Sequence, residues 1–203
     1  MRLAFVGQSV YFRQCALELA ADGLEPSFID FRAAMASGPL LAALHRIDPD
    51  VVLVFRPEII PTGLFDSLRA LTIGYLTEPL PRGEPAAHAD LRMRLRDLEE
   101  VDAQNFDRIV SFDPLIAETA ASVLSVWRSV PLPVADSLFG KVRPRSDPPS
   151  LLFVGRSTEY REELLAPLKR AYPIAHIGHG LFGEALHSQR ALPGLPQHVA
   201  RRV

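Results

Sequence analysis

The sequence predicts an α/β fold, with a doubly wound parallel sheet followed by the start of a second sheet of the same Rossmann-like kind. Short apolar runs of strand length alternate with longer segments of helical pattern, as in layered α/β proteins. Most of these runs are apolar throughout, which is typical of parallel strands covered on both faces. Residues 3–13 (LAFVGQSVYFR) and 151–161 (LLFVGRSTEYR) are also nearly the same segment.

The elements of the first sheet follow from these runs. The expected strands cover residues 3–6, 27–31, 51–55, 72–76, 108–112 and 126–130, and the expected helices cover 10–21, 39–47, 62–70, 87–104 and 114–124. The helix at 87–104 is the best marked, because Leu91, Leu95, Leu98 and Val101 form one apolar stripe. Its opposite charges at i,i+4 spacing predict a solvated face. Asp113, followed by a proline, is expected to cap the helix after the fifth strand.

A linker divides the chain. Residues 141–149 (KVRPRSDPP) carry three prolines and three basic residues without periodicity. We therefore expect a first domain over 1–140 and a second over 150–203, the latter with strands at 151–154 and 174–177 and helices at 159–171 and 181–192. Each copy of the repeated segment then opens a domain as strand, glycine turn and helix, although any strand–helix unit can have this pattern. The second domain is short and is expected to be incomplete, so another chain could complete it.

Composition excludes several classes of protein. The 203 residues carry a net charge of −2 and a pI near 6.3, without the basic cluster that nucleic-acid binding requires. Cys15 is the only cysteine, so an intrachain disulfide is impossible, and a small buried hydrophobe is the expected role. No apolar run reaches the roughly 18 residues of a membrane span, and no leader is visible. A cytoplasmic protein is expected.

Common cofactor motifs are missing. Neither glycine turn has the G-x-G-x-x-G pattern, so a nicotinamide cofactor is not expected. Asp48-Pro49-Asp50 has the form of a metal-binding D-x-D box, but it precedes its strand and is interpreted as a turn. His176 and His179 lack a clear third ligand. We therefore expect neither a metal nor a resident cofactor.

The carboxyl edge of the first sheet is the expected place for a ligand. Polar residues follow its strands there: Gln8, Ser9, Asp30, Arg32, Arg56, Glu58, Glu78 and Asp113. Gly7, together with Gln8, Ser9, Asp30 and Arg56 from this list, is predicted to line a cleft. Glu78 follows a buried strand and precedes a proline, so it is a candidate general base or ligand for sugar hydroxyls. A solvated loop acid is an equally good interpretation of Glu78.

The order of segments resembles that of two-domain GT-B glycosyltransferases, particularly the bacterial spore-maturation-type glycosyltransferase-like group. The resembling segments are residues 3–9, 50–55 (DVVLVF), 75–79 (YLTEP), 107–112 (DRIVSF), 130–143 (VPLPVADSLFGKVR) and 151–165. The resemblance implies an acceptor-binding first domain, a nucleotide-sugar-binding second domain and catalysis between them without a bound metal. It also implies that Gly155, Arg156 and Arg161 bind the donor phosphates, since related retaining members have a basic residue six positions after the glycine of a "GR" turn.

Three functions remain open from the sequence. The first is transfer of a sugar from a nucleotide-diphosphate sugar to an unknown acceptor, by a protein that is expected to be truncated or incomplete. The second is a non-catalytic Rossmann-like binding or interaction module that pairs with another chain. The third, a small nucleotide-binding regulatory protein, is less favoured because no phosphate loop is specific enough.

Overall fold

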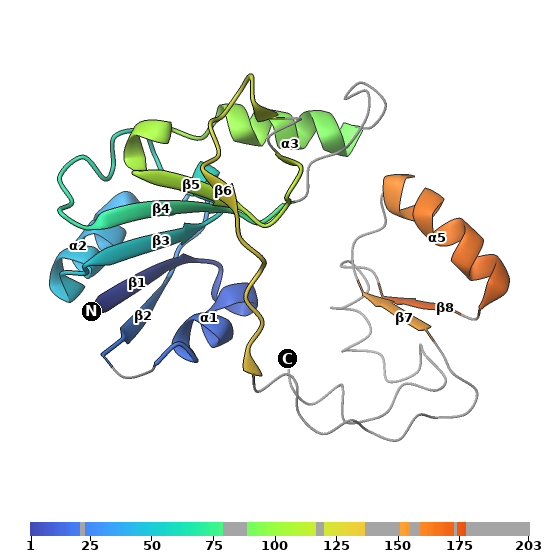
Figure 1. The fold of residues 1–203 in the computed structure, drawn as a ribbon, viewed down its shortest axis with the longest axis horizontal. Coiled ribbons are helices and arrows are strands. Elements are labelled where there is room, and N and C mark those ends of the chain that lie inside the picture. The colour runs from blue at the N-terminus through green and yellow to red at the C-terminus, as the bar shows by residue number, and fades with distance from the viewer. Residues whose placement is uncertain are drawn as a thin grey trace. The chain divides into compact units, whose positions relative to one another are not determined.

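The computed structural model describes residues 1–20, 23–78, 89–116, 120–136, 151–154, 159–172 and 174–177. Contacts divide the chain into two compact units, Met1–Val142 and Arg143–Val203 (Figure 1). The expected linker at 141–149 and the expected helix at 181–192 lie outside the described residues. Within the described ranges, no helix is long and apolar enough to cross a membrane.

The first unit is built on a parallel sheet of six strands in the order β2-β1-β3-β4-β5-β6. The strands are β1 (Arg2–Gly7), β2 (Glu25–Asp30), β3 (Val51–Phe55), β4 (Leu71–Leu76), β5 (Arg108–Ser111) and β6 (Arg128–Ser129). Each lies within about two residues of its predicted range, and the predicted parallel α/β fold is confirmed.

Two apolar clusters cover the two faces of this sheet. Ala4 and Val6 of β1 belong to one cluster and Phe5 to the other, because successive side chains of a strand point to opposite faces. Helix α1 (Ser9–Leu17) adds Ala16 to the cluster of Phe5, whereas α2 (Ser37–Ile47) adds Leu40 and Leu44 to the other one. β3 (VVLVF) is apolar at every position, as expected of a strand covered on both faces.

Helix α3 (Ala89–Glu99) ends before the predicted residue 104, and a 3-10 turn, η2 (Ala103–Asn105), follows it. The predicted stripe is confirmed where it is described: Leu98 and Val101 are buried, and Leu95 packs against them in the same cluster. Beyond β5, the backbone N–H of Leu115 donates to Asp113 Oδ1 at 3.0 Å, so Asp113 caps that turn as expected. Residues 117–119 of the helix expected there lie outside the described residues.

The predicted helix at 62–70 is wrong, because this segment forms consecutive turns. Side chains of the η2 region bind its backbone: Phe65 N–H donates to Asn105 Oδ1 at 2.9 Å, and Gly63 N–H donates to Asp102 Oδ2 at 2.9 Å. Asn105 Nδ2 also donates to Pro61 O at 3.0 Å. Gly63 has a left-handed φ of +67°, which interrupts helical geometry. Backbone groups of this segment that would pair with one another in a helix are thus bound by the side chains of Asp102 and Asn105.

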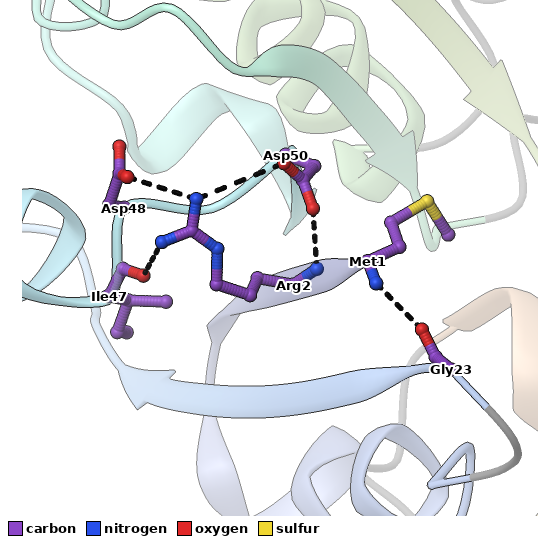
Figure 2. A network of polar contacts seen from close by, with 6 residues as sticks. All are labelled: Met1, Arg2, Gly23, Ile47, Asp48 and Asp50. Carbon is purple, nitrogen blue, oxygen red and sulfur yellow. Dashed lines mark hydrogen bonds and ion pairs between the residues drawn. The ribbon is translucent and has the colours of Figure 1, made fainter.

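The D-x-D triplet lies at the amino edge of the sheet, and its acids bind Arg2 (Figure 2). Arg2 Nη2 is 2.9 Å from Asp48 Oδ2, and the Arg2 backbone N–H donates to Asp50 Oδ2 at 2.6 Å. Arg2 Nη1 donates to Ile47 O at 3.2 Å, at the end of α2. These contacts tie the start of β1 to the α2–β3 turn, which supports the interpretation of the triplet as a structural turn.

The second unit contains β7 (Leu151–Val154), α5 (Glu159–Ala171) and β8 (Ile174–Ile177), as predicted. The two strands pair in parallel, with Leu151 opposite Ile174 and Val154 opposite Ile177. A parallel pair needs a crossover connection, which α5 supplies. This β–α–β unit has the same order as β1–α1–β2, and the repeated sequence segments form the first strand and the start of the helix in both.

Candidate functional site

The carboxyl edge of the first sheet carries two separate groups of polar residues. In the strand order, β1 lies between β2 and β3, so the chain continues to one side of β1 first and then to the other. The point where the order reverses, at the carboxyl end of β1, is the usual ligand position in an open α/β sheet. One group surrounds the β1–α1 turn and contains Gln8, Ser9 and Asp30. The other follows β3 and β4 and contains Arg56 and Glu78.

At the β1–α1 turn, a carboxylate of the chain already binds the start of the helix. The Ser9 backbone N–H donates to Asp30 Oδ1 at 2.8 Å, and Arg32 Nη2 lies 3.3 Å from Asp30 Oδ2. The hydrogen bond from Ser9, together with the charge of Arg32, lowers the pKa of Asp30 below its ordinary value. Gln8, at the N-cap position, makes no side-chain capping bond. The position where α1 could bind an external anion is therefore partly filled by Asp30.

Gly7 has a packing role. A Cβ built on Gly7 would lie 3.0 Å from Phe55 Cβ, which is too close for an ordinary contact. The Phe12 ring of α1 stacks on Phe55 with the ring centroids 4.1 Å apart. The lack of a side chain at Gly7 thus lets β1, β3 and α1 pack closely together, and this packing accounts for the glycine.

The second group lines a cavity of about 20 Å³ at the ends of β3 and β4. Its polar lining residues are Arg56, Glu58, Thr77, Glu78, Arg94 and Asp97. Arg56 Nε donates to Glu58 Oε1 at 2.7 Å, and Arg94 Nη2 lies 3.0 Å from Glu78 Oε2. We call these five charged residues (Arg56, Glu58, Glu78, Arg94 and Asp97) the edge cluster.

Arg56 is held in an unusual backbone conformation. It has φ +67° and ψ +72°, in the left-handed region that residues other than glycine seldom adopt. Its backbone N–H donates to Tyr75 O at 3.0 Å, and its side chain is fixed by Glu58. The Glu58 side chain is 12% exposed, and this burial raises the pKa of Glu58, although the charge of Arg56 acts in the opposite direction. Such strain is frequent at functional sites.

The charge of the edge cluster indicates what it can bind. Two guanidinium groups face three carboxylates, which gives a net charge of −1 when all five are ionised. The cavity has room for about one water molecule. Glu78, whose side chain is 47% exposed, lies at the solvent side. The cluster therefore suits a hydroxyl or ammonium group at its mouth and disfavours a diphosphate.

A larger groove of about 800 Å³ lies between α1 and the chain that follows β6. Its lining includes Ser9, Tyr11, Arg13 and Gln14 of α1, with Pro133–Ala135 on the other side. This volume is within the range of small-molecule sites. The mixture of an aromatic ring, polar groups and a guanidinium could hold a small polar ligand.

The structure brings together only part of the predicted site. Arg56 and Glu78 share the edge cluster, whereas Gly7, Gln8, Ser9 and Asp30 surround the β1–α1 turn. Gly155 and Arg156 lie outside the described residues, and Arg161 lies on α5 of the second unit.

Sequence reasoning missed Arg94 and Asp97, because the charges of α3 were assigned to a solvated face. Both residues line the cavity of the edge cluster. Arg94 precedes Leu98 of the buried stripe by four residues, and Asp97 follows Arg94 by three, so the helical spacing puts the three on neighbouring positions and was the signal that could have found them.

These features define an α/β protein with a six-stranded parallel sheet and an acid-rich carboxyl edge. No protein-family model matches the chain, and no curated protein is significantly similar to it. Within the described ranges, no group of three or more His, Cys, Asp or Glu side chains is arranged to hold a metal ion.

Proposed function

We propose that the protein is a GT-B-type glycosyltransferase, in which the first unit binds the acceptor and the second binds a nucleotide-diphosphate sugar. The observation that carries the proposal is that both units begin with the same strand–turn–helix sequence segment. The second unit begins with the parallel β7–α5–β8 arrangement, as the first begins with β1–α1–β2, and the repeated segments lie at corresponding places. Two successive Rossmann-like openings are the arrangement that a two-domain transferase requires.

The charges of the first unit favour the acceptor there. Asp30 occupies the Ser9 N–H at the start of α1, and the edge cluster has an excess of carboxylates. Both features oppose a diphosphate. The hydroxyl groups of an acceptor, in contrast, can donate to carboxylate oxygens, and the groove beside α1 offers room for a small polar molecule.

The second copy of the repeat favours the donor. Its turn has Arg156 at the position of Gln8, and Arg161 stands where the first copy has Arg13. A guanidinium binds phosphate oxygens with two parallel hydrogen bonds, and a helix start adds favourable backbone N–H groups. In this proposal Arg156 and Arg161 stabilise the leaving diphosphate, so the reaction needs no bound metal for that purpose.

Glu78 is the proposed proton acceptor for the acceptor hydroxyl. It follows the end of β4, and its side chain is more exposed than that of Glu58. Arg94 of α3 orients it through an ion pair. Arg94 is a positioning residue in this scheme. Glu58 binds the side chain of Arg56 and thereby shapes the same edge.

Nucleotide-sugar binding tests the proposal. The melting temperature of the chain is measured with UDP-, GDP- and TDP-glucose, and at one hundred times Kd the bound state gains about 2.7 kcal/mol. The Arg156→Ala/Arg161→Ala double variant should lose this stabilisation, whereas Arg170→Ala, an exposed change on the helix that carries Arg161, should keep it. If none of the sugars stabilises the chain, the non-catalytic binding module is favoured instead.

A further inference from the structure

β6, the last strand in the order of the first sheet, is preceded by an exposed tryptophan. Trp127 is the only tryptophan in the chain, and 53% of its surface is exposed. Its backbone N–H donates to Ile109 O at 2.8 Å, which fixes the residue at the start of β6. A large aromatic side chain in this position exposes apolar surface to water and does not belong to either core cluster.

Two arginines accompany this ring. Arg108 begins β5 and Arg128 begins β6, and their guanidinium carbons lie 5.6 Å and 3.7 Å from the centroid of the Trp127 ring. Arg108 Nη1 also donates to Asp107 O at 2.6 Å. Stacking on an aromatic ring uses the face of a guanidinium and leaves N–H groups on its edge available to a carboxylate.

Among the described residues, the two positive groups of this surface are not paired with an acid. Within the part of the chain that the structure describes, neither Arg108 nor Arg128 forms an ion pair. The carboxylate of Asp107 is nearby in sequence, but it accepts from Thr72 N at 2.8 Å and from Thr72 Oγ1 at 3.1 Å. Two positive groups therefore flank an exposed ring in a chain whose net charge is −2.

An open strand edge lies beside the ring. β6 is the last strand in the order of the sheet, and β5 is its neighbour on one side only among the described strands. Residues 127–134 are all exposed. The outer edge of such a strand can pair with an extended segment through main-chain hydrogen bonds.

We propose that Trp127, Arg108 and Arg128 form a docking surface for an extended, acidic segment of a partner protein, which pairs with the open edge of β6. The two guanidinium groups bind its carboxylates, and the indole packs against an apolar side chain between them. Tryptophan and arginine are the residues that most often dominate protein interfaces. The small number of basic groups and the negative net charge disfavour nucleic acid as the partner.

Trp127 fluorescence reports directly on this surface, because no other tryptophan contributes. The probe is a short peptide of alternating valine and glutamate, and its matched control alternates valine and lysine. We expect a saturable change in emission with the glutamate peptide alone. Replacing valine by proline retains the charge but removes N–H donors, and this peptide should bind more weakly.

Variants separate binding from folding. Arg128→Gln should raise the Kd of the glutamate peptide about tenfold, while Arg46→Gln, at an exposed position on α2, should leave it unchanged. Thermal melting followed by circular dichroism verifies that both variants fold. The proposal is overturned if the emission does not change, if the lysine peptide gives the same response, or if Arg128→Gln binds normally. Equal binding of the proline peptide would overturn strand pairing. A response confined to anionic phospholipid vesicles or single-stranded DNA would overturn the choice of partner.

Discussion

Asp30 shows how one side chain changes the chemistry of a turn. From sequence, the β1–α1 turn resembles an anion site, because a glycine precedes the start of a helix. In the structure, Asp30 at the end of β2 accepts the Ser9 N–H and is also paired with Arg32. The anion that stabilises this helix start is thus supplied by the protein. The second copy of the turn has Arg156 in place of Gln8, which is the difference that assigns the donor to the second unit in our proposal.

Replacement of Asp30 should destabilise the first unit in a pH-dependent way. Asp30→Ala removes the bond to Ser9 N–H, and we expect a loss of about 1 kcal/mol at neutral pH. Because folding lowers the pKa of Asp30 below the ordinary 3.8, its contribution is present above that pH and is lost as the pH falls through the folded value. Urea unfolding followed by Trp127 emission measures this, with Glu25→Ala on the same strand as the control. A difference that persists unchanged in strong acid would contradict this account.

The contribution of Glu58 to the free energy of unfolding should depend on pH in the opposite direction. Burial raises the pKa of Glu58 above the ordinary 4.5, so the folded state holds its proton more tightly than the unfolded state does. The contribution of this group is greatest below pH 4.5 and is lost as the pH rises through the folded value. Relative to Glu58→Gln, the wild-type protein should therefore lose unfolding free energy over that range. Urea unfolding at a series of pH values tests this, and a pH-independent difference would show that burial does not dominate at Glu58.

Site residues were predictable from sequence only where strand position determined them. Arg56 and Glu78 directly follow strands that were recognised as apolar runs, so their place at the carboxyl edge could be inferred. Their pairing could not, because it depends on Arg94 and Asp97, which α3 brings from elsewhere in the chain. The left-handed backbone of Arg56 has no sequence signal, since glycine is the usual residue there.

At the scale of elements, apolar runs predicted the strands better than amphipathic patterns predicted the connections. β3 and β7 have the predicted bounds, whereas the helix expected at 62–70 is replaced by turns. The apolar spacing of that segment is real: Leu64 and Leu68 pack against the core cluster, in which Phe65 is buried. Turns bury the same side chains because Asn105 and Asp102 bind their backbone, and sequence gives no sign of contacts made across some forty residues.

Asn105 should be essential for this turn segment. Its side chain is 1% exposed and binds both Phe65 N–H and Pro61 O. Asn105→Ala leaves these buried groups without their partner, so we expect a loss of roughly 2–4 kcal/mol in unfolding free energy. Gln104→Ala, at the exposed neighbouring position, should change it little. Urea unfolding of both variants measures the difference, and equal stabilities would mean that the turns do not depend on Asn105.

At the scale of the whole molecule, the central feature is the division into two compact units that open with the same sequence segment. Parallel β–α–β units begin both, and the first continues into a six-stranded sheet. Composition and apolar pattern were sufficient to predict this class of fold. They could not predict that the first opening would be occupied by Asp30, since that contact joins the end of β2 to the start of α1.

The most direct test of the two-unit account is to map UDP-glucose binding on the amide signals of the chain by nuclear magnetic resonance. The account predicts that the amide signals of residues 155–161 shift in a saturable manner, and that those of Gln8 and Ser9, where Asp30 already accepts the Ser9 N–H, do not. Arg156→Ala should abolish the shifts at the second turn. Saturable shifts at Gln8 and Ser9 with none at 155–161 would contradict the assignment of the donor to the second unit.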